Sequence, residues 1–165
     1  MEEALALPHG WRGDGVIARV ASRSMAGELS GAGIPVVNVS GIQLQGVNFP
    51  QVTNDLVASA RLAADHFLDR GFRSFAYFSL QGLEYVAKHQ QAFCESVTKS
   101  GFPCAVLAVE PAHGAEPDWN LDVAKLGAWL KTLPKPVAVL TWNPSSAREI
   151  IFASQAANFL VPEDV

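Results

Sequence analysis

Five side chains in this sequence have the chemistry to hold a small polar ligand, and each stands at or near a predicted turn between a strand and a helix. They are Asp55, Tyr85, His89, Trp119 and Asn143. Ligands of an open α/β sheet bind outside the carboxyl ends of its strands, so we expect these residues at one rim. Flat aromatic faces accept the C–H side of a sugar ring, while polar groups pair with its hydroxyls. The combination favours a carbohydrate-sized site.

These candidates also have structural explanations, which the sequence leaves open. Asp55 suits the cap of the helix that follows it, and Trp119 could be a lid over the core. Trp142 is a further indole at this rim, but it ends a predicted buried strand and is interpreted as a core residue. His89 could be an ordinary, partly exposed helix residue. Alternatively, Asp55 and His89 could form an acid–base pair, as in an α/β sugar-processing enzyme.

Motifs for other chemistry do not occur in the sequence. It contains no G-x-S-x-G elbow and no Walker loop. Gly27, Gly31 and Gly33 precede a predicted strand rather than follow one, so they are not a dinucleotide fingerprint. The four histidines are scattered, and no second ligand near His66 completes a metal face. We therefore predict a binding protein, with no catalytic residues, no cofactor and no metal.

Composition sets further bounds on the class of protein. The chain has 165 residues, 49% of them hydrophobic, enough for one ordinary domain or two small lobes with a core. No apolar run approaches the roughly 20 residues that span a bilayer, and no signal peptide is visible, so we expect a cytoplasmic protein without membrane contact. Net charge is −4 without a basic block, which argues against a nucleic-acid surface here. The two cysteines are expected to be buried, reduced thiols.

The positioning elements alternate between strand and helix. The segment 52–80 shows the pattern most clearly: capping side chains at 53–55, an apolar stripe at helical spacing, Gly71 as a stop and a short apolar strand. Strands are predicted at 15–20, 36–39, 75–80, 105–109 and 137–142, and helices at 24–29, 56–70, 84–99, 121–132 (capped by Asn120) and 145–158. Such alternation predicts a doubly wound, mainly parallel α/β fold, with the long loop 40–53 crossing between two halves.

Several segments also resemble one known family. VTNDLVASARLAADHFLDRGFRSFAYFSL (52–80) resembles the crossing segment of sugar-binding domains of the lactose-repressor and periplasmic-binding-protein class. Further similar runs, in the same order, cover the chain from about residue 7 to residue 165: GDGVIARV (13–20), DWNLDVAKLGAWLKTLPKPVAVLTW (118–142), SSAREII (145–151) and VPEDV (161–165). The resemblance implies a type I, two-lobed sensor domain that is truncated here. Residues 1–50 would be a remnant of the N-terminal lobe, and residues 51–165 an incomplete C-terminal lobe.

The resemblance implies a function as well. Such a domain senses an effector sugar, here xylose or a related pentose, for a bacterial-type transcription regulator of sugar catabolism genes. DNA would be bound only through an AraC-type helix-turn-helix domain that this chain lacks. The unpaired strand edges of a truncated sheet would invite homodimerisation. A non-binding structural fragment is a further alternative.

Individual site roles also follow from the resemblance. Asp55 would lie at the ligand or the hinge, and His89 stands where an arginine commonly binds sugar hydroxyls. Trp119 matches an indole that stacks on the sugar, and Asn143 matches an amide that hydrogen-bonds it. Pro144 replaces an aspartate that usually follows this amide.

Overall fold

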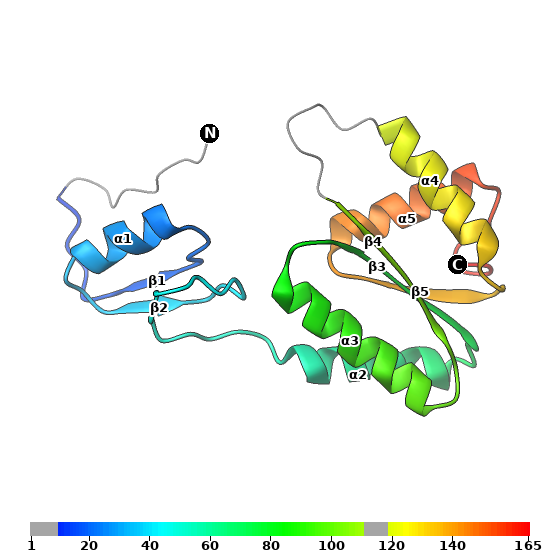
Figure 1. The fold of residues 1–165 in the computed structure, drawn as a ribbon, viewed down its shortest axis with the longest axis horizontal. Coiled ribbons are helices and arrows are strands. Elements are labelled where there is room, and N and C mark those ends of the chain that lie inside the picture. Colours follow the sequence, from blue (N-terminus) through cyan, green and yellow to red (C-terminus); the bar gives the residue numbers. More distant parts are fainter. Residues whose placement is uncertain (1–9, 111–118) are drawn as a thin grey trace. The chain divides into compact units, whose positions relative to one another are not determined.

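The computed structural model of the chain describes residues 10–110 and 119–165, with backbone alone at position 80 and positions 119–122 (Figure 1). The chain divides into two compact units, Met1–Asp55 and Leu56–Val165. Strands and helices alternate along both: β1 Val16–Ala18, α1 Arg23–Gly31, β2 Val36–Asn38, α2 Leu56–Asp69, β3 Ser74–Leu80, α3 Glu84–Lys99, β4 Cys104–Val109, α4 Trp119–Thr132, β5 Val137–Thr141 and α5 Pro144–Ala156.

The first unit is a small β–α–β arrangement. Strands β1 and β2 pair in parallel, and α1 closes a core that includes Val20, Leu29 and Val36. The buried Asn38 side chain holds the strand ends together, because its Oδ1 accepts from the backbone N–H groups of Val20 (3.0 Å) and Ser40 (2.9 Å). The loop after β2 then returns to pair with Asn38 through Gln51.

The second unit is a parallel three-stranded sheet in the order β4-β3-β5, covered by helices on both faces (Figure 1). Helices α2 and α3 pack on one face against Phe75, Tyr77 and Ala138. Helices α4 and α5 pack on the other face against Phe78. The alternation follows from the period of two in a strand, which sends neighbouring side chains of β3 to opposite faces.

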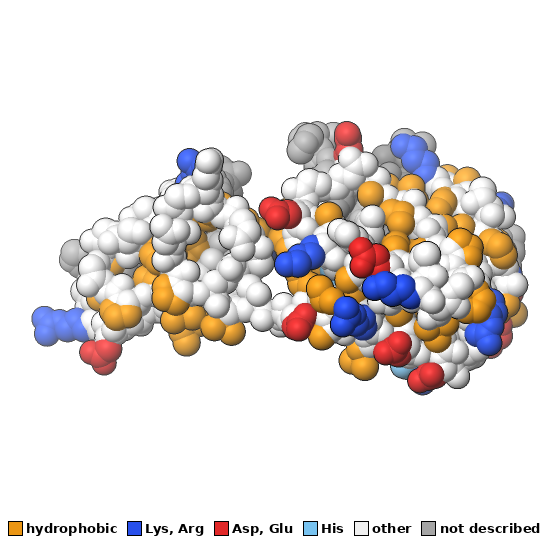
Figure 2. Space-filling view, turned by 60° about the horizontal axis from the view of Figure 1, so that its bottom comes forward, with side chains coloured by type: hydrophobic (Ala, Val, Ile, Leu, Met, Phe, Trp, Pro, Cys, Tyr) orange, Lys and Arg blue, Asp and Glu red, His pale blue; other side chains and the backbone are white. Residues whose placement is uncertain are grey.

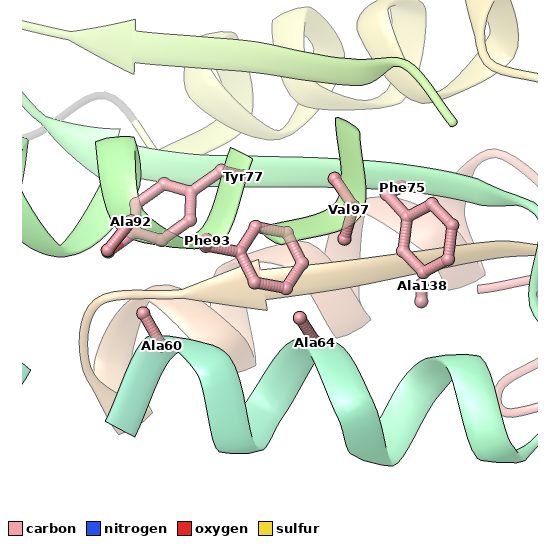
Figure 3. Close-up of a cluster of buried hydrophobic side chains, with 8 residues drawn as sticks. All are labelled: Ala60, Ala64, Phe75, Tyr77, Ala92, Phe93, Val97 and Ala138. Atoms are coloured by element: carbon pink, nitrogen blue, oxygen red, sulfur yellow. The ribbon is translucent and has the colours of Figure 1, made fainter. Parts of the chain in front are cut away.

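Small residues on α2 allow α3 to approach closely. Ala60 and Ala64 are fully buried and face the rings of Tyr77 and Phe93 (Figure 3). Because an alanine presents only a methyl group, the larger side chains of β3 and α3 fill the space. The position of α3 on the sheet is thus set by core packing.

The predicted doubly wound parallel α/β class is confirmed, with differences at element ends. The bounds of α3 agree with the prediction, whereas α4 begins at Trp119, so the expected capping role of Asn120 is wrong. Strand β5 ends at Thr141, which leaves Trp142 in the following turn. The predicted loop between β4 and α4 falls largely on residues 111–118, outside the described part.

The described helices include none that is long and apolar enough to cross a membrane. On the face of the second unit shown in Figure 2, acidic and basic side chains are interspersed. That face therefore presents no single-sign patch of the kind that binds nucleic acid.

Candidate functional site

Three rings meet at the carboxyl ends of β3 and β5, and we call them the rim cluster: Tyr85, His89 and Trp142. The Tyr85 and Trp142 ring centroids are 5.0 Å apart at 60°, and the His89 and Trp142 centroids are 5.4 Å apart at 76°. Tyr85 and His89 share one side of α3 because they are four residues apart on a helix. Trp142 reaches them directly after β5 ends. Tyr85 and Trp142 are half-buried, so the cluster keeps exposed surface at the rim.

The His89 ring is held in place by a hydrogen bond with the buried Tyr77. The Tyr77 hydroxyl lies 2.7 Å from His89 Nδ1, and the two side chains are 0% and 8% exposed. Burial raises the pKa of Tyr77, with a smaller electrostatic contribution from Cys94, and burial lowers the pKa of His89 below its ordinary value of 6.5. Both groups are therefore neutral at pH 7.

The Tyr77–His89 contact assigns the tautomer of this neutral imidazole, because Nδ1 is the acceptor that the described residues offer to the buried Tyr77 O–H. The Tyr77 O–H donates to Nδ1, and the ring then carries its own proton on Nε2. Among the residues that the structure describes, no other group bonds to this imidazole. His89 thus offers one N–H donor, fixed in direction by the bond to Tyr77, to a partner at the rim.

Asn143 has a structural role at the same edge. Its Oδ1 accepts from the backbone N–H of Ser146 (2.9 Å), which caps α5, and Pro144 occupies the first turn of that helix. The side-chain Nδ2 group finds no acceptor within the described part of the chain. Asn143 can therefore cap the helix and still donate to a ligand beside Trp142.

A groove with polar and apolar lining residues lies on the β4 side of α3. Ser79 Oγ donates to Gln90 Oε1 (3.2 Å), and Gln81 Nε2 donates to the Ala108 carbonyl (2.8 Å). The groove encloses about 370 Å³ and is lined by Ser79, Gln81, Gly82, Leu83, Glu84, Ala87, Gln90 and Ala108. This volume is at the lower end of what small-molecule sites use.

The structure brings together some of the predicted site residues and leaves others unplaced. Tyr85 and His89 lie in one cluster, and Asn143 follows the Trp142 of that cluster. Asp55 ends the first unit and is not placed relative to them. Trp119 begins α4, but its side chain lies outside the described residues.

Two members of the site are missing from the sequence-based list. The sequence favours a core position for Trp142, whereas in the structure it lies past the end of β5 and contacts Tyr85 and His89. The sequence feature that identifies Trp142 is the period of two along β5 and the residue after it, which puts Ala138, Leu140 and Trp142 on the face covered by α3. Tyr77 is also outside the sequence-based list, although the same period of two places it under α3.

The described side chains include no group of three or more histidine, cysteine, aspartate or glutamate residues arranged to hold a metal ion. The site therefore offers rings and neutral hydrogen-bonding groups. Such a set can bind and orient an uncharged polyol through stacking and hydrogen bonds.

The sequence profile of the periplasmic binding protein-like domain matches residues 64–165. The chain belongs to this family, as the resemblance predicted. The xylose operon regulatory protein of Haemophilus influenzae is 26% identical to it over 158 residues, aligned with 92% of this chain and 40% of the regulator.

Solved structures agree on the fold. The structure of a xylose-binding transcription activator superposes with a TM-score of 0.75 at 25% identity, covering 92% of this chain and 41% of the activator. A LacI family regulator from Enterococcus faecium with bound ribose gives 0.66 at 19% identity, covering 92% and 56%. The latter likeness shows the fold alone. The chain thus spans well under two thirds of the length of these relatives.

Proposed function

We propose that this chain is part of the sugar-sensing domain of a transcription regulator of sugar catabolism genes. Its effector is D-xylose or a related pentose. The observation that carries the proposal is the rim cluster with Asn143: aromatic surface beside fixed N–H donors, at the strand ends where this fold binds ligands. Two of the similar proteins are, by name, a xylose operon regulator and a xylose-binding activator.

Each group has a defined task in this proposal. The exposed faces of Tyr85 and Trp142 meet the C–H side of the sugar ring. His89 Nε2–H and the Asn143 Nδ2 group donate to its hydroxyls. Trp119 adds a second indole, and Asp55 has a place at the ligand or the hinge. No bond is made or broken, so the protein is not an enzyme.

The proposal also includes the conformational change that sugar binding favours, the DNA-binding domain and the oligomeric state. Residues 1–50 and 51–165 belong to two lobes, and the sugar favours their closed arrangement by its difference in affinity for the two states. DNA is bound by an AraC-type helix-turn-helix domain of the parent protein, which works as a cytoplasmic homodimer. Sedimentation velocity of the parent protein tests the proposed homodimer. A monomer at all concentrations would contradict it.

Calorimetry tests sugar binding directly. The 165-residue chain is titrated with D-xylose, L-arabinose and D-ribose up to about 10 mM, a range that detects even millimolar affinities. We expect saturable heat with at least one pentose. The absence of heat with every pentose would contradict the proposal.

Two variants and one control locate the site. Asn143→Asp keeps an oxygen to cap α5 but removes the two donors, and Trp142→Leu removes the indole face. Each should weaken pentose binding by about ten-fold, the value of one good hydrogen bond or ring contact. Gln91→Ala changes an exposed residue of α3 and should leave the affinity unchanged. Equal affinities for all variants would place binding elsewhere.

A further inference from the structure

Cys94 and Cys104, the only two cysteines of the chain, lie in direct contact. Their Sγ atoms are 3.0 Å apart, both thiols are free, and both side chains are half-buried. Cys94 is in the middle of α3, and Cys104 is the first residue of β4. Two thiols at this separation are an unusual arrangement for residues that serve only as small hydrophobes.

The connection between α3 and β4 holds the two sulfurs in place. The helix ends in a closed turn, in which the Gly101 N–H donates to Thr98 and the Phe102 N–H donates to Val97. Gly101 has a φ of +91°, which an L side chain rarely adopts. Phe102 packs against the same core cluster as both cysteines. The pair is therefore fixed by the fold and does not depend on a mobile loop.

Both thiols keep some exposed surface, and a cavity lies beside Cys104, whose sulfur is 3.0 Å from that of Cys94. Cys104 lines a cavity of about 340 Å³ at the amino ends of β3 and β4. Its walls are largely apolar and include two basic residues, Arg73 and Lys135. A small anionic reagent such as oxidised glutathione meets both a channel and favourable charge there.

We propose that Cys94 and Cys104 are a redox pair, which a small-molecule disulfide such as oxidised glutathione converts into an intramolecular disulfide. In the first step the Cys94 thiolate attacks the reagent, forms a mixed disulfide and releases one glutathione thiolate. In the second step Cys104 loses its proton and attacks the Cys94 sulfur, which releases the second glutathione. The protein loses two hydrogens, and two thiols of glutathione are produced.

The hydrogen bond within the pair supports this order of attack. In the neutral pair the Cys94 thiol donates to Cys104, and once Cys94 has ionised the Cys104 thiol donates to its thiolate, which lowers the pKa of Cys94. The same bond, together with burial, raises the pKa of Cys104. Cys94 is thus the better nucleophile and Cys104 the resolving thiol. Since α3 also carries Tyr85 and His89, the disulfide ties the helix that bears two of the three rim-cluster rings to β4.

The test uses the reduced 165-residue chain and needs no sugar. It is equilibrated with graded ratios of oxidised to reduced glutathione, remaining thiols are alkylated, and intact masses are measured. We expect a monomer lighter by two hydrogens, reversed by dithiothreitol, with little glutathione adduct. The equilibrium constant should favour the disulfide at least about ten-fold more in the native chain than in concentrated urea, because the fold holds the thiols together.

Single variants separate the two roles. Cys104→Ser should accumulate a glutathione adduct at Cys94, and Cys94→Ser should react more slowly. A stable adduct on the wild-type chain, a disulfide between chains, or thiols that stay unmodified where the denatured chain reacts would overturn the proposal. Equal equilibrium constants in buffer and in urea would overturn it as well. The wild-type measurements stand even if a variant fails to fold.

Discussion

Replacing Tyr77 with phenylalanine tests the support beneath the candidate site. The change removes one hydroxyl from a ring that is 0% exposed, and it leaves the ring itself in the core (Figure 3). His89 Nδ1 then loses the donor that lies 2.7 Å away. The net loss of a hydrogen bond is about 1 kcal/mol, and a buried acceptor left without a donor costs roughly 1–3 kcal/mol. We expect Tyr77→Phe to lower the free energy of unfolding by about 2 kcal/mol.

Urea unfolding at pH 7, followed by far-ultraviolet circular dichroism, measures this change. Tyr85→Phe is a matched control, since it removes the same atom from a half-buried ring for which the described residues supply no hydrogen bond. This control should lower the free energy of unfolding by less than about 0.5 kcal/mol. The double variant Tyr77→Phe with His89→Leu removes both partners and should recover part of the loss. If Tyr77→Phe and Tyr85→Phe were equally stable, His89 would not depend on Tyr77 and its tautomer would be unassigned.

Three other substitutions report on single interactions. Burial lowers the pKa of His89, so as pH falls the unfolded chain is protonated at this histidine before the folded chain, and stability present above about pH 6.5 is lost below it. His89→Gln should therefore reduce the loss of unfolding free energy between pH 7 and pH 5, measured by urea titration. An unchanged loss would assign the pH dependence to other groups. Asn143→Ala should lower the free energy of unfolding by about 1 kcal/mol because it removes the cap of α5, whereas Asn143→Ser should leave it nearly unchanged. Equal thermal midpoints for the two variants would refute the capping role. Lys135 donates to the Leu130 and Leu133 carbonyls, and its Nζ lies 4.3 Å from the Phe159 ring centroid. Lys135→Met should therefore lower the free energy of unfolding by about 1 kcal/mol, whereas Lys135→Arg should retain most of that stability.

Sequence patterns predict most of the fold because its start and stop signals are local. The bounds of α3 follow from Gly101 and Pro103 after the helix, and the stripe on α2 follows from its alanines. The start of α4 does not follow in this way. An asparagine is favoured at a helix cap but is also tolerated in the first turn, so Asn120 alone cannot mark the boundary.

The site is harder to predict, because it depends on register. Tyr85 and His89 are recognisable as one side of a helix. Their contact with Trp142 depends on the pairing of Phe78 with Thr141, which brings the end of β5 beside α3. Tyr77 is recognisable only as an apolar strand residue until α3 is placed over it. The relation of Asp55 to the other candidates involves two units and is beyond any local pattern.

Core packing sets the position of α3, which carries two rings of the rim cluster. Tyr77 of β3 and Phe93 of α3 pack in one core cluster with α2, and this cluster holds the middle of α3 on the sheet. Any change that moves α3 therefore acts at its first turns, where Tyr85 and His89 meet Trp142, and at its middle, where Cys94 meets Cys104. A ligand that contacts the rim cluster and an oxidant that joins the thiols act on one rigid element. The Tyr77–His89 hydrogen bond fastens this element to β3 at the rim cluster.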